Sequence, residues 1–206
     1  MKLSKPKFWD YPGISFWSVI LYPLSLLFLL ISSIIKLLKI QKKFPIPVIC
    51  IGNIYVGGTG KTPLALEIFK ITKSIGKTYL NKNRKKAINS LISFKHDVAI
   101  LDDGFQDFSI KKDFSIVCFN SRQLIGNGFI IPSGPLRENI KSIKRADCIV
   151  INGDRNIEFE NKINKINKNV KIFYSKYRIT NLDKFKNKKV VAFEGIGNPT
   201  NFFELL

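Results

Sequence analysis

The residues best suited to chemistry form a glycine-rich segment at positions 57–63, with the sequence GGTGKTP. A short apolar run at positions 48–52 precedes it and is typical of a buried strand. An amphipathic run at positions 64–75 follows it and predicts a helix. Strand, glycine loop and helix form the context in which backbone N–H groups surround phosphate oxygens. The segment therefore predicts a P-loop that binds ATP.

Each residue type in this loop has a physical reason to be there. Glycines let the backbone approach phosphate without Cβ clashes, Lys61 would reach the β- and γ-phosphates, and the Thr62 hydroxyl would bind Mg²⁺. The usual pattern begins with glycine, but Tyr55 stands there; the alternative, a glycine turn with a chance GKT, fits the flanking strand and helix less well. We expect the ATP phosphates to bind at Tyr55, Val56, Gly57, Gly58, Thr59, Gly60, Lys61 and Thr62.

A pair of carboxylates supplies the other half of a nucleotide site. Asp102 and Asp103 follow an apolar run at positions 98–101 and precede Gly104. Taken alone, this string is more typical of a turn. In a parallel sheet, however, it would end a strand beside the P-loop, where a carboxylate can hold Mg²⁺ against the phosphates. The pairing with the upstream loop favours the functional interpretation.

The N-terminal region carries a long apolar segment. Positions 14–35 contain no charged residue, and as a helix they could cross a bilayer core of roughly 30 Å. Trp9, Tyr11 and Trp17 lie near one end, as headgroup-level aromatics do, and four lysines follow at positions 36, 39, 42 and 43. This pattern predicts attachment to an anionic membrane surface.

Four interpretations of that segment differ in plausibility. A cleaved signal peptide would need a small-residue cleavage site, which does not follow the segment. A buried core helix would need a larger protein around it than 206 residues provide. A spanning helix and a helix embedded in one leaflet both remain, and we favour the second.

Composition excludes some classes of protein. A hydrophobic content of 45% excludes a disordered chain, and 206 residues exclude a large multidomain protein. The net charge of +19 indicates an anionic partner. A basic nucleic-acid-binding module would explain the charge, but no aromatic–basic recognition motif accompanies it, so no nucleic acid is expected. Three widely spaced cysteines predict neither a disulfide framework nor a zinc site.

Apolar runs alternate with helical patterns along the chain. Strands are predicted at 48–52, 98–101, 115–119, 148–151, 170–174 and 190–193, and helices at 64–75, 84–93 and 159–167. This order predicts an α/β fold with a mostly parallel, P-loop NTPase-like sheet flanked by helices, preceded by the membrane-associated helix. We divide the chain into that helix at 1–43, a kinase-like core at 44–187 and the start of a C-terminal lobe at 188–206.

Several further strings accompany the loop and the aspartates. In chain order they are KPKFW at 5–9, GNIYVGGTGKTP at 52–63, DDGFQ at 102–106, GNGFIIPSGPLRE at 126–138, RAD at 145–147 and GIGNP at 195–199. Together, and in this order, they resemble one family, the tetraacyldisaccharide 4'-kinases of lipid A synthesis. GGTGKTP, DDGFQ and GPLRE in combination are specific, and the tyrosine at position 55 is similar to that family's own variant of the loop.

The resemblance implies an activity and a place for it. It implies transfer of the ATP γ-phosphate, with Mg²⁺, to the 4'-hydroxyl of tetraacyldisaccharide 1-phosphate at the cytoplasmic face of the inner membrane. It also implies that Lys61, Asp102, Asp103, Gln106 and Arg137 are catalytic, with Arg137 as a phosphate clamp. Thr62, Asp102, Asp103 and Glu138 would hold the metal.

The sequence also departs from the family pattern. Position 76 leads almost directly to the helix predicted at 84–93, where the family carries a long segment that includes an Asp thought to act as base. The C-terminal region is short, and Asp107 replaces a histidine that usually follows DDGFQ. Loss of a positioned base lowers rates by roughly 10²–10⁴, so we expect a weak or inactive kinase. The alternative is a membrane-attached P-loop protein that binds or hydrolyses ATP without a lipid acceptor.

Overall fold

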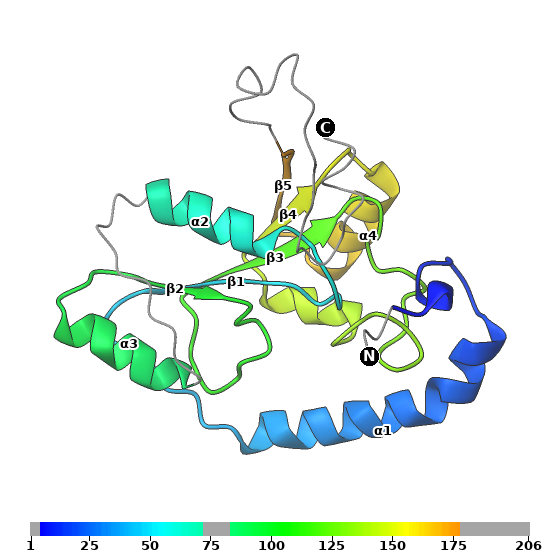
Figure 1. Cartoon of the computed structure of the whole chain (residues 1–206), viewed down its shortest axis with the longest axis horizontal. Helices are drawn as coiled ribbons and strands as arrows, with labels where there is room; N and C mark the ends of the chain where they lie inside the picture. Colours follow the sequence, from blue (N-terminus) through cyan, green and yellow to red (C-terminus); the bar gives the residue numbers. More distant parts are fainter. Residues whose placement is uncertain (1–4, 72–82, 178–206) are drawn as a thin grey trace, which may run out of the picture.

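A five-stranded, all-parallel sheet forms the centre of the protein, as the computed structural model shows for residues 5–71 and 83–177. The strand order is β2-β1-β3-β4-β5 (Figure 1). The strands are β1 (Val48–Gly52), β2 (Ala99–Asp102), β3 (Phe114–Asn120), β4 (Cys148–Asn152) and β5 (Lys171–Ser175). The helices are α1 (Phe16–Leu38), α2 (Lys61–Ile71), α3 (Arg84–Ser93) and α4 (Ile157–Ile166), with short 3₁₀ helices η1 (Lys7–Trp9) and η2 (Ile140–Arg145).

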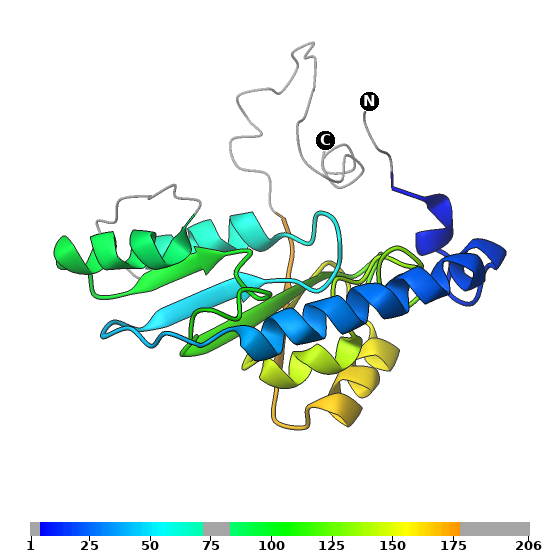
Figure 2. The same ribbon diagram turned by 90° about the horizontal axis from the view of Figure 1, so that it is seen from below.

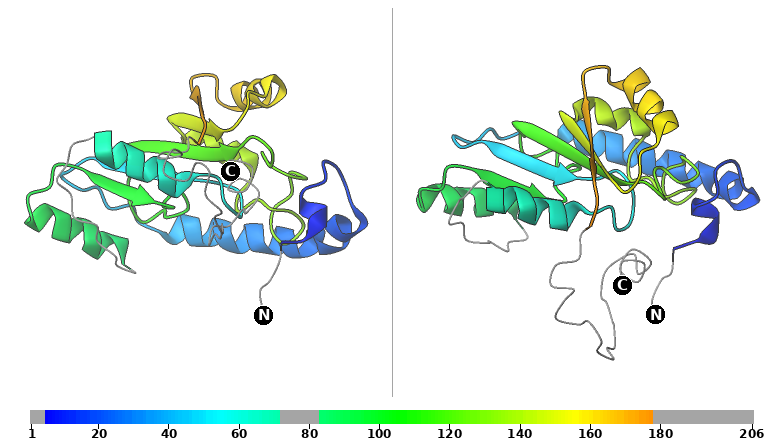
Figure 3. Two further views of the ribbon diagram at one scale, coloured as in Figure 1. Left: turned by 45° about the horizontal axis from the view of Figure 1, so that its top comes forward. Right: turned by 90° about the horizontal axis from the view of Figure 1, so that it is seen from above.

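Both faces of the sheet are covered, so the inner strands are apolar on successive residues rather than on alternate ones. Ile51, Ile116 and Val150 face α2 in one cluster. Val117, Phe119 and the alternate residues of β4 pack on the opposite face against α4 and η2. The helix α3 covers β2 on that same face through Ile88. Figure 3 shows the resulting layers, with helices on either side of the sheet.

The predicted elements agree with these positions. The helix predicted at 84–93 matches α3, and the five described strands lie within two residues of their predicted limits. The helix predicted from position 64 begins three residues earlier, at Lys61, because the main-chain N–H of Leu64 already bonds the carbonyl of Gly60. The strand predicted at 190–193, the GIGNP string and the boundary at 188 lie outside the described residues.

The long N-terminal helix α1 has the reverse of a normal surface helix's polarity. Only 11% of its most apolar window is buried, and the buried residues of the helix are Ser18 and Ser25. The hydroxyl of Ser25 donates to the carbonyl of Ile130 at 2.8 Å and lies 2.8 Å from the Ser133 hydroxyl. Asn127 donates to Ser18 at 3.1 Å.

Those hydrogen bonds hold α1 along the side of the protein instead of letting it project away from it. Further contacts follow along the helix, since Tyr22 packs edge-on against Phe129 and Lys36 Nζ lies 4.9 Å from the centre of the Phe108 ring; Figure 2 shows α1 in front of the body to which these contacts attach it. Most of its large apolar side chains are exposed, and Trp17, Leu27 and Leu30 are more than half exposed. A helix in this position presents a long hydrophobic surface beside the sheet.

Candidate nucleotide and phosphate-transfer site

The glycine loop connects β1 to α2 at the carboxyl edge of the sheet. Strand β1 ends at Gly52, and α2 begins at Lys61. The strand order changes direction at β1, with β2 on one side and β3 on the other. A ligand binds at such a switch point in open parallel sheets. Gly57 and Gly60 have φ values of +142° and +83°, which other residues adopt only with strain.

The first aspartate lies beside the loop, as the sequence predicts. Strand β2 is paired with β1 so that Asp102 is opposite Ile51. The hydroxyl of Thr62 donates to the Asp102 carboxylate at 2.8 Å. The prediction that this carboxylate and the end of the P-loop meet at one edge is therefore confirmed.

The second aspartate brings two cations together. Its carboxylate accepts from Arg137 Nη1 at 2.9 and 3.0 Å, and Lys61 Nζ lies 3.7 Å away. Asp103 has φ = +54°, a left-handed conformation that is uncommon outside glycine and is found at functional sites when the surroundings impose it. The arrangement places one ammonium and one guanidinium on the same carboxylate.

Two amide side chains, those of Gln106 and Asn53, hold the loop by hydrogen bonds. Gln106 Nε2 donates to the carbonyl of Asn53 at 2.8 Å, and its Oε1 lies 3.5 Å from Arg137 Nη1. The fully buried Asn53 donates to the carbonyl of Tyr55 at 2.6 Å and to the Thr59 hydroxyl at 3.0 Å. Sequence reasoning chose Gln106 but missed Asn53, although a polar residue directly after a buried strand was a usable signal.

Residues from the β4–β5 side of the sheet also lie close to the loop. A Cβ atom on Gly60 would lie 2.9 Å from Asn152 Nδ2 and 3.1 Å from the Tyr177 hydroxyl. Asn152 is the last residue of β4 and Tyr177 follows β5, and the sequence interpretation gave neither a role. Only the register of the parallel strands brings them to the P-loop.

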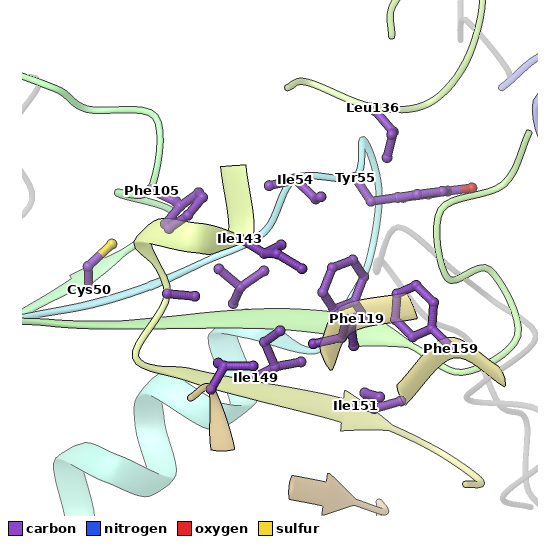
Figure 4. Packing of buried hydrophobic residues seen from close by; sticks show 14 of the residues in the cluster. Cys50, Ile54, Tyr55, Phe105, Phe119, Leu136, Ile143, Ile149, Ile151 and Phe159 are labelled. Atoms are coloured by element: carbon purple, nitrogen blue, oxygen red, sulfur yellow. The ribbon is translucent and has the colours of Figure 1, made fainter. Parts of the chain in front are cut away.

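The structure corrects the expected position of one loop residue. The side chain of Tyr55 is fully buried and packs in the core with Ile54 and Leu136, as Figure 4 shows, instead of facing a nucleotide. Its hydroxyl donates to Asp10 at 3.1 Å and accepts from Lys5 at 2.7 Å. Tyr55 is therefore part of the support of the loop, because a side chain enclosed in this way cannot contact phosphate.

The expected metal ligands separate into two groups. Glu138 pairs with Arg145 at 2.7 Å, and within residues 5–71 and 83–177 no three His, Cys, Asp or Glu side chains form a metal-binding group. Glu138 therefore does not join the aspartates. The Thr62 hydroxyl and the exposed Asp102 carboxylate do form an adjacent oxygen pair, which suits a Mg²⁺ ion that keeps several waters.

Comparison with known proteins identifies the family of this chain. The family model described as tetraacyldisaccharide-1-P 4'-kinase (LpxK) matches residues 17–80 and 71–206. A protein of Pelagibacter ubique named tetraacyldisaccharide 4'-kinase is 41% identical over all of this chain and 74% of its own length. The chain belongs to the tetraacyldisaccharide-1-P 4'-kinase family.

Other members of this kinase family agree. Proteins of the same name are 33% identical in Rickettsia canadensis, over 100% of this chain and 74% of their length, and 30% identical in Shewanella sediminis, over 91% and 69%. The crystal structure of LpxK from Aquifex aeolicus in complex with ATP has a TM-score of 0.53 and 20% identity, covering 87% of this chain and 86% of that one. This similarity confirms the predicted P-loop kinase fold, and the resemblance stated from the motifs is confirmed as well.

The same comparisons locate a difference from those relatives. The matched span in Pelagibacter ubique is 236 residues, which exceeds the 206 of this chain. The two parts of the family match meet at residues 71–80, where the sequence departs from the family pattern. The relative therefore carries residues that this chain lacks, and the nucleotide-site residues described above are outside that position.

A cavity of about 670 Å³ adjoins the paired aspartates on the side of α3. Its lining carries more positive than negative charge: four cations (Lys39, Arg84, Lys85 and Arg137) and two carboxylates (Asp103 and Asp107). Arg84 lies 3.5 Å from the carboxylate of Asp107. Burial acts to raise the pKa of Asp107, but hydrogen bonds from Ser109 and the charge of Arg84 outweigh it and lower the pKa below its usual value.

Proposed function

We propose that this chain transfers the γ-phosphate of Mg·ATP to the 4'-hydroxyl of tetraacyldisaccharide 1-phosphate. One observation carries the proposal: Lys61 and Arg137 both approach the Asp103 carboxylate, beside the Thr62–Asp102 pair. Phosphoryl transfer depends on positioning and charge stabilisation more than on covalent chemistry by the protein. A lysine, an arginine, a hydroxyl and two carboxylates at one sheet edge supply both.

Each of these groups has a separate role in the proposed reaction. Backbone N–H groups of Gly57–Thr62 and the Lys61 ammonium bind the phosphates, while Arg137 binds two oxygens of the transferred group with its planar guanidinium. Thr62 and Asp102 would hold Mg²⁺, which supplies charge neutralisation between the phosphates. Asp103 keeps the two cations at the reacting position, and Gln106 keeps Arg137 and the loop in register.

The outward apolar face of α1 supports a bilayer as the partner on that side. Burying the face in one leaflet removes its leucines from water, at roughly 1.5–3 kcal/mol for each large side chain. Lysines at 36, 39, 42 and 43 follow directly, and anionic headgroups attract each with about 1 kcal/mol. Because α1 lies along the body, we propose attachment within one leaflet at the cytoplasmic face of the inner membrane, where the acceptor's acyl chains would remain.

The proposed domains correspond to these separate functions of membrane attachment and phosphate transfer. Residues 1–43 attach the chain to the membrane, residues 44–187 form the kinase core, and residues 188–206 begin the C-terminal lobe. The basic cavity beside Asp103 supports an anionic acceptor, because its lining lies between the membrane-facing Lys39 and the proposed transfer site. We further propose that the missing internal segment makes turnover slower than in longer relatives by a factor of roughly 10²–10⁴.

A second function is favoured by that missing segment alone. A chain with an intact nucleotide half and no base for the acceptor could hydrolyse ATP at the membrane without phosphorylating lipid. The two functions differ in where the γ-phosphate goes.

Labelled ATP separates them. The chain is incubated in mixed micelles with γ-labelled Mg·ATP and tetraacyldisaccharide 1-phosphate, and label is followed in the lipid and in free phosphate. Label in the lipid that depends on Asp103 supports the kinase. Phosphate release that is unchanged by the acceptor supports the ATPase, and the absence of Mg·ATP binding by calorimetry would overturn both.

A further inference from the structure

Tyr55 stands where the usual P-loop pattern has glycine, and its surroundings give it a purpose. The phenol is fully buried, accepts a hydrogen bond from Lys5 at 2.7 Å and donates to Asp10 at 3.1 Å. Lys5 and Asp10 also form an ion pair with each other. Three side chains thus close a triangle between the N-terminal turn and the first residue of the loop.

The triangle keeps the phenol protonated. Burial raises the pKa of Tyr55, and the neighbouring charge of Asp10 and the hydrogen bond to it raise the pKa further. The hydroxyl therefore remains a donor throughout the physiological range. Lys5 Nζ also lies 5.2 Å from the centre of the tyrosine ring, so the cation contacts both the hydroxyl and the ring.

The position of the ring sets the path of the loop that follows. A Cβ atom on Gly57 would lie 3.4 Å from the ring of Tyr55, so the loop turns directly against it. Main-chain bonds on either side tie the same residues to the segment before Arg137: Val56 N donates to the carbonyl of Pro135 at 2.8 Å, and Arg137 N donates to that of Ile54 at 2.7 Å. Movement of the ring would therefore move both the P-loop and Arg137.

The N-terminal turn that holds the phenol is itself held firmly. Trp9 Nε1 donates to the carbonyl of Pro132 at 3.0 Å, and Asn127 N donates to the carbonyl of Trp9 at 2.9 Å. The same loop, at residues 127–133, holds both buried serines of α1: the Ile130 carbonyl accepts from Ser25, and the Asn127 amide donates to Ser18. The turn is thus fixed to the body of the protein at the place where the membrane-facing helix is also fixed.

We propose that Tyr55 is a positioning residue for the reaction, and that Lys5 and Asp10 set the phosphate-binding conformation of the loop through its hydroxyl. The inference rests on the proposed function and deepens it. The usual pattern has glycine at the first loop position. Here the tyrosine side chain, held by Lys5 and Asp10 from outside the loop, fixes the conformation instead. The effect is expected in ATP binding more than in acceptor binding, because the ring packs directly against the phosphate-binding loop at Gly57.

Tyr55→Phe tests the proposal, since it removes the hydroxyl and keeps the ring. We expect the KM for ATP to rise roughly threefold to tenfold, with the KM for the lipid acceptor unchanged, as is usual when one binding site is loosened. Lys5→Met and Asp10→Asn should give a similar rise, and the double variant Tyr55→Phe/Asp10→Asn should be no worse than either single variant. Lys5→Arg, which keeps the positive charge, should leave the KM for ATP at the wild-type value. Lys7→Met on the same turn is the matched control.

Two measurements keep this test separate from that of the proposed function. Mg·ATP affinity is measured by calorimetry on every variant, with thermal unfolding in parallel. If wild type binds Mg·ATP and Tyr55→Phe binds it equally well, the positioning role is wrong while the kinase assignment stands. If the variants lose thermal stability but keep the KM for ATP, the triangle is structural only, and the inference is overturned. If wild type fails to bind Mg·ATP, the proposed function fails first.

Discussion

Two regions of this protein use polar side chains in opposite ways. At the carboxyl edge of the sheet, Lys61, Asp103 and Arg137 converge from three separate segments on a partly exposed site. Along α1, the polar residues Ser18 and Ser25 are buried and the apolar residues face out. In the first region the fold concentrates charge for a ligand, and in the second it removes polarity from a surface. Both are departures from a uniform apolar core and polar surface, and each points to a partner.

The largest expected effect is on the charged region. Lys61→Met should lower phosphoryl transfer roughly 10²–10³-fold, because it removes a cation placed to stabilise transition-state charge, with little change in thermal unfolding. Lys70→Met, an exposed lysine later on α2 paired with Glu67, is the matched control. Steady-state rates of label transfer check the prediction, and equal losses in the two variants would contradict it.

Polar substitutions on the exposed apolar face of α1 should weaken membrane binding. The double variant Leu27→Ser/Leu30→Ser should weaken binding to anionic vesicles on the order of 100-fold or more, since two large side chains no longer enter the bilayer. Stability in solution should be nearly unchanged, because both leucines are exposed. Vesicle sedimentation checks this, with Leu66→Ser on α2, also an exposed leucine, as control. Unchanged sedimentation would show that α1 does not enter lipid.

The next prediction concerns the buried serines of α1, which attach the helix to the body of the protein. Ser25→Ala should cost about 1–3 kcal/mol of unfolding free energy, because the Ile130 carbonyl and the Ser133 N–H lose a buried partner. Ser33→Ala, an exposed serine on the same helix, should be neutral. Denaturant unfolding in detergent gives both values. A neutral Ser25→Ala would mean that the serines do not hold α1 to the body.

The smallest effect concerns pH. The pKa of Asp107 is lowered in the folded state, so the folded form binds its proton less readily than the unfolded form. Its stabilising contribution is therefore present above the usual aspartate pKa and is lost as the pH falls through the lowered value. Asp107→Asn should be about 1 kcal/mol less stable than wild type at pH 7, and the difference should shrink as the pH falls below the usual aspartate pKa and through the lowered one.

Urea unfolding at several pH values checks this prediction. Asp97→Asn, at an exposed position, is the matched control for the substitution. A constant difference between Asp107→Asn and wild type across that range would show that the carboxylate's titration is not involved.

Local sequence patterns predicted most elements because their causes are local. The glycines, the lysine and the strand before them specify the P-loop, and the strands' apolar runs reflect burial on both faces. The paired aspartates could be placed beside the loop because parallel strands end at one edge. By contrast, the contact of Asn152 with the loop and the direction of the Tyr55 side chain depend on residues far apart in the chain, and no local pattern marks them. Asn53 did carry a local signal, because it is a polar residue directly after a buried strand.

The amino-acid sequence by itself determined the family, the parallel α/β order and the residues able to bind phosphate, since each follows from residue type and short spacing. The tertiary structure decided which way side chains face and which distant groups meet. Strand register brings Asn152 to Gly60, and the N-terminal turn brings Lys5 and Asp10 to Tyr55. Those contacts join residues separated by tens of positions, where only the packed fold fixes their distance.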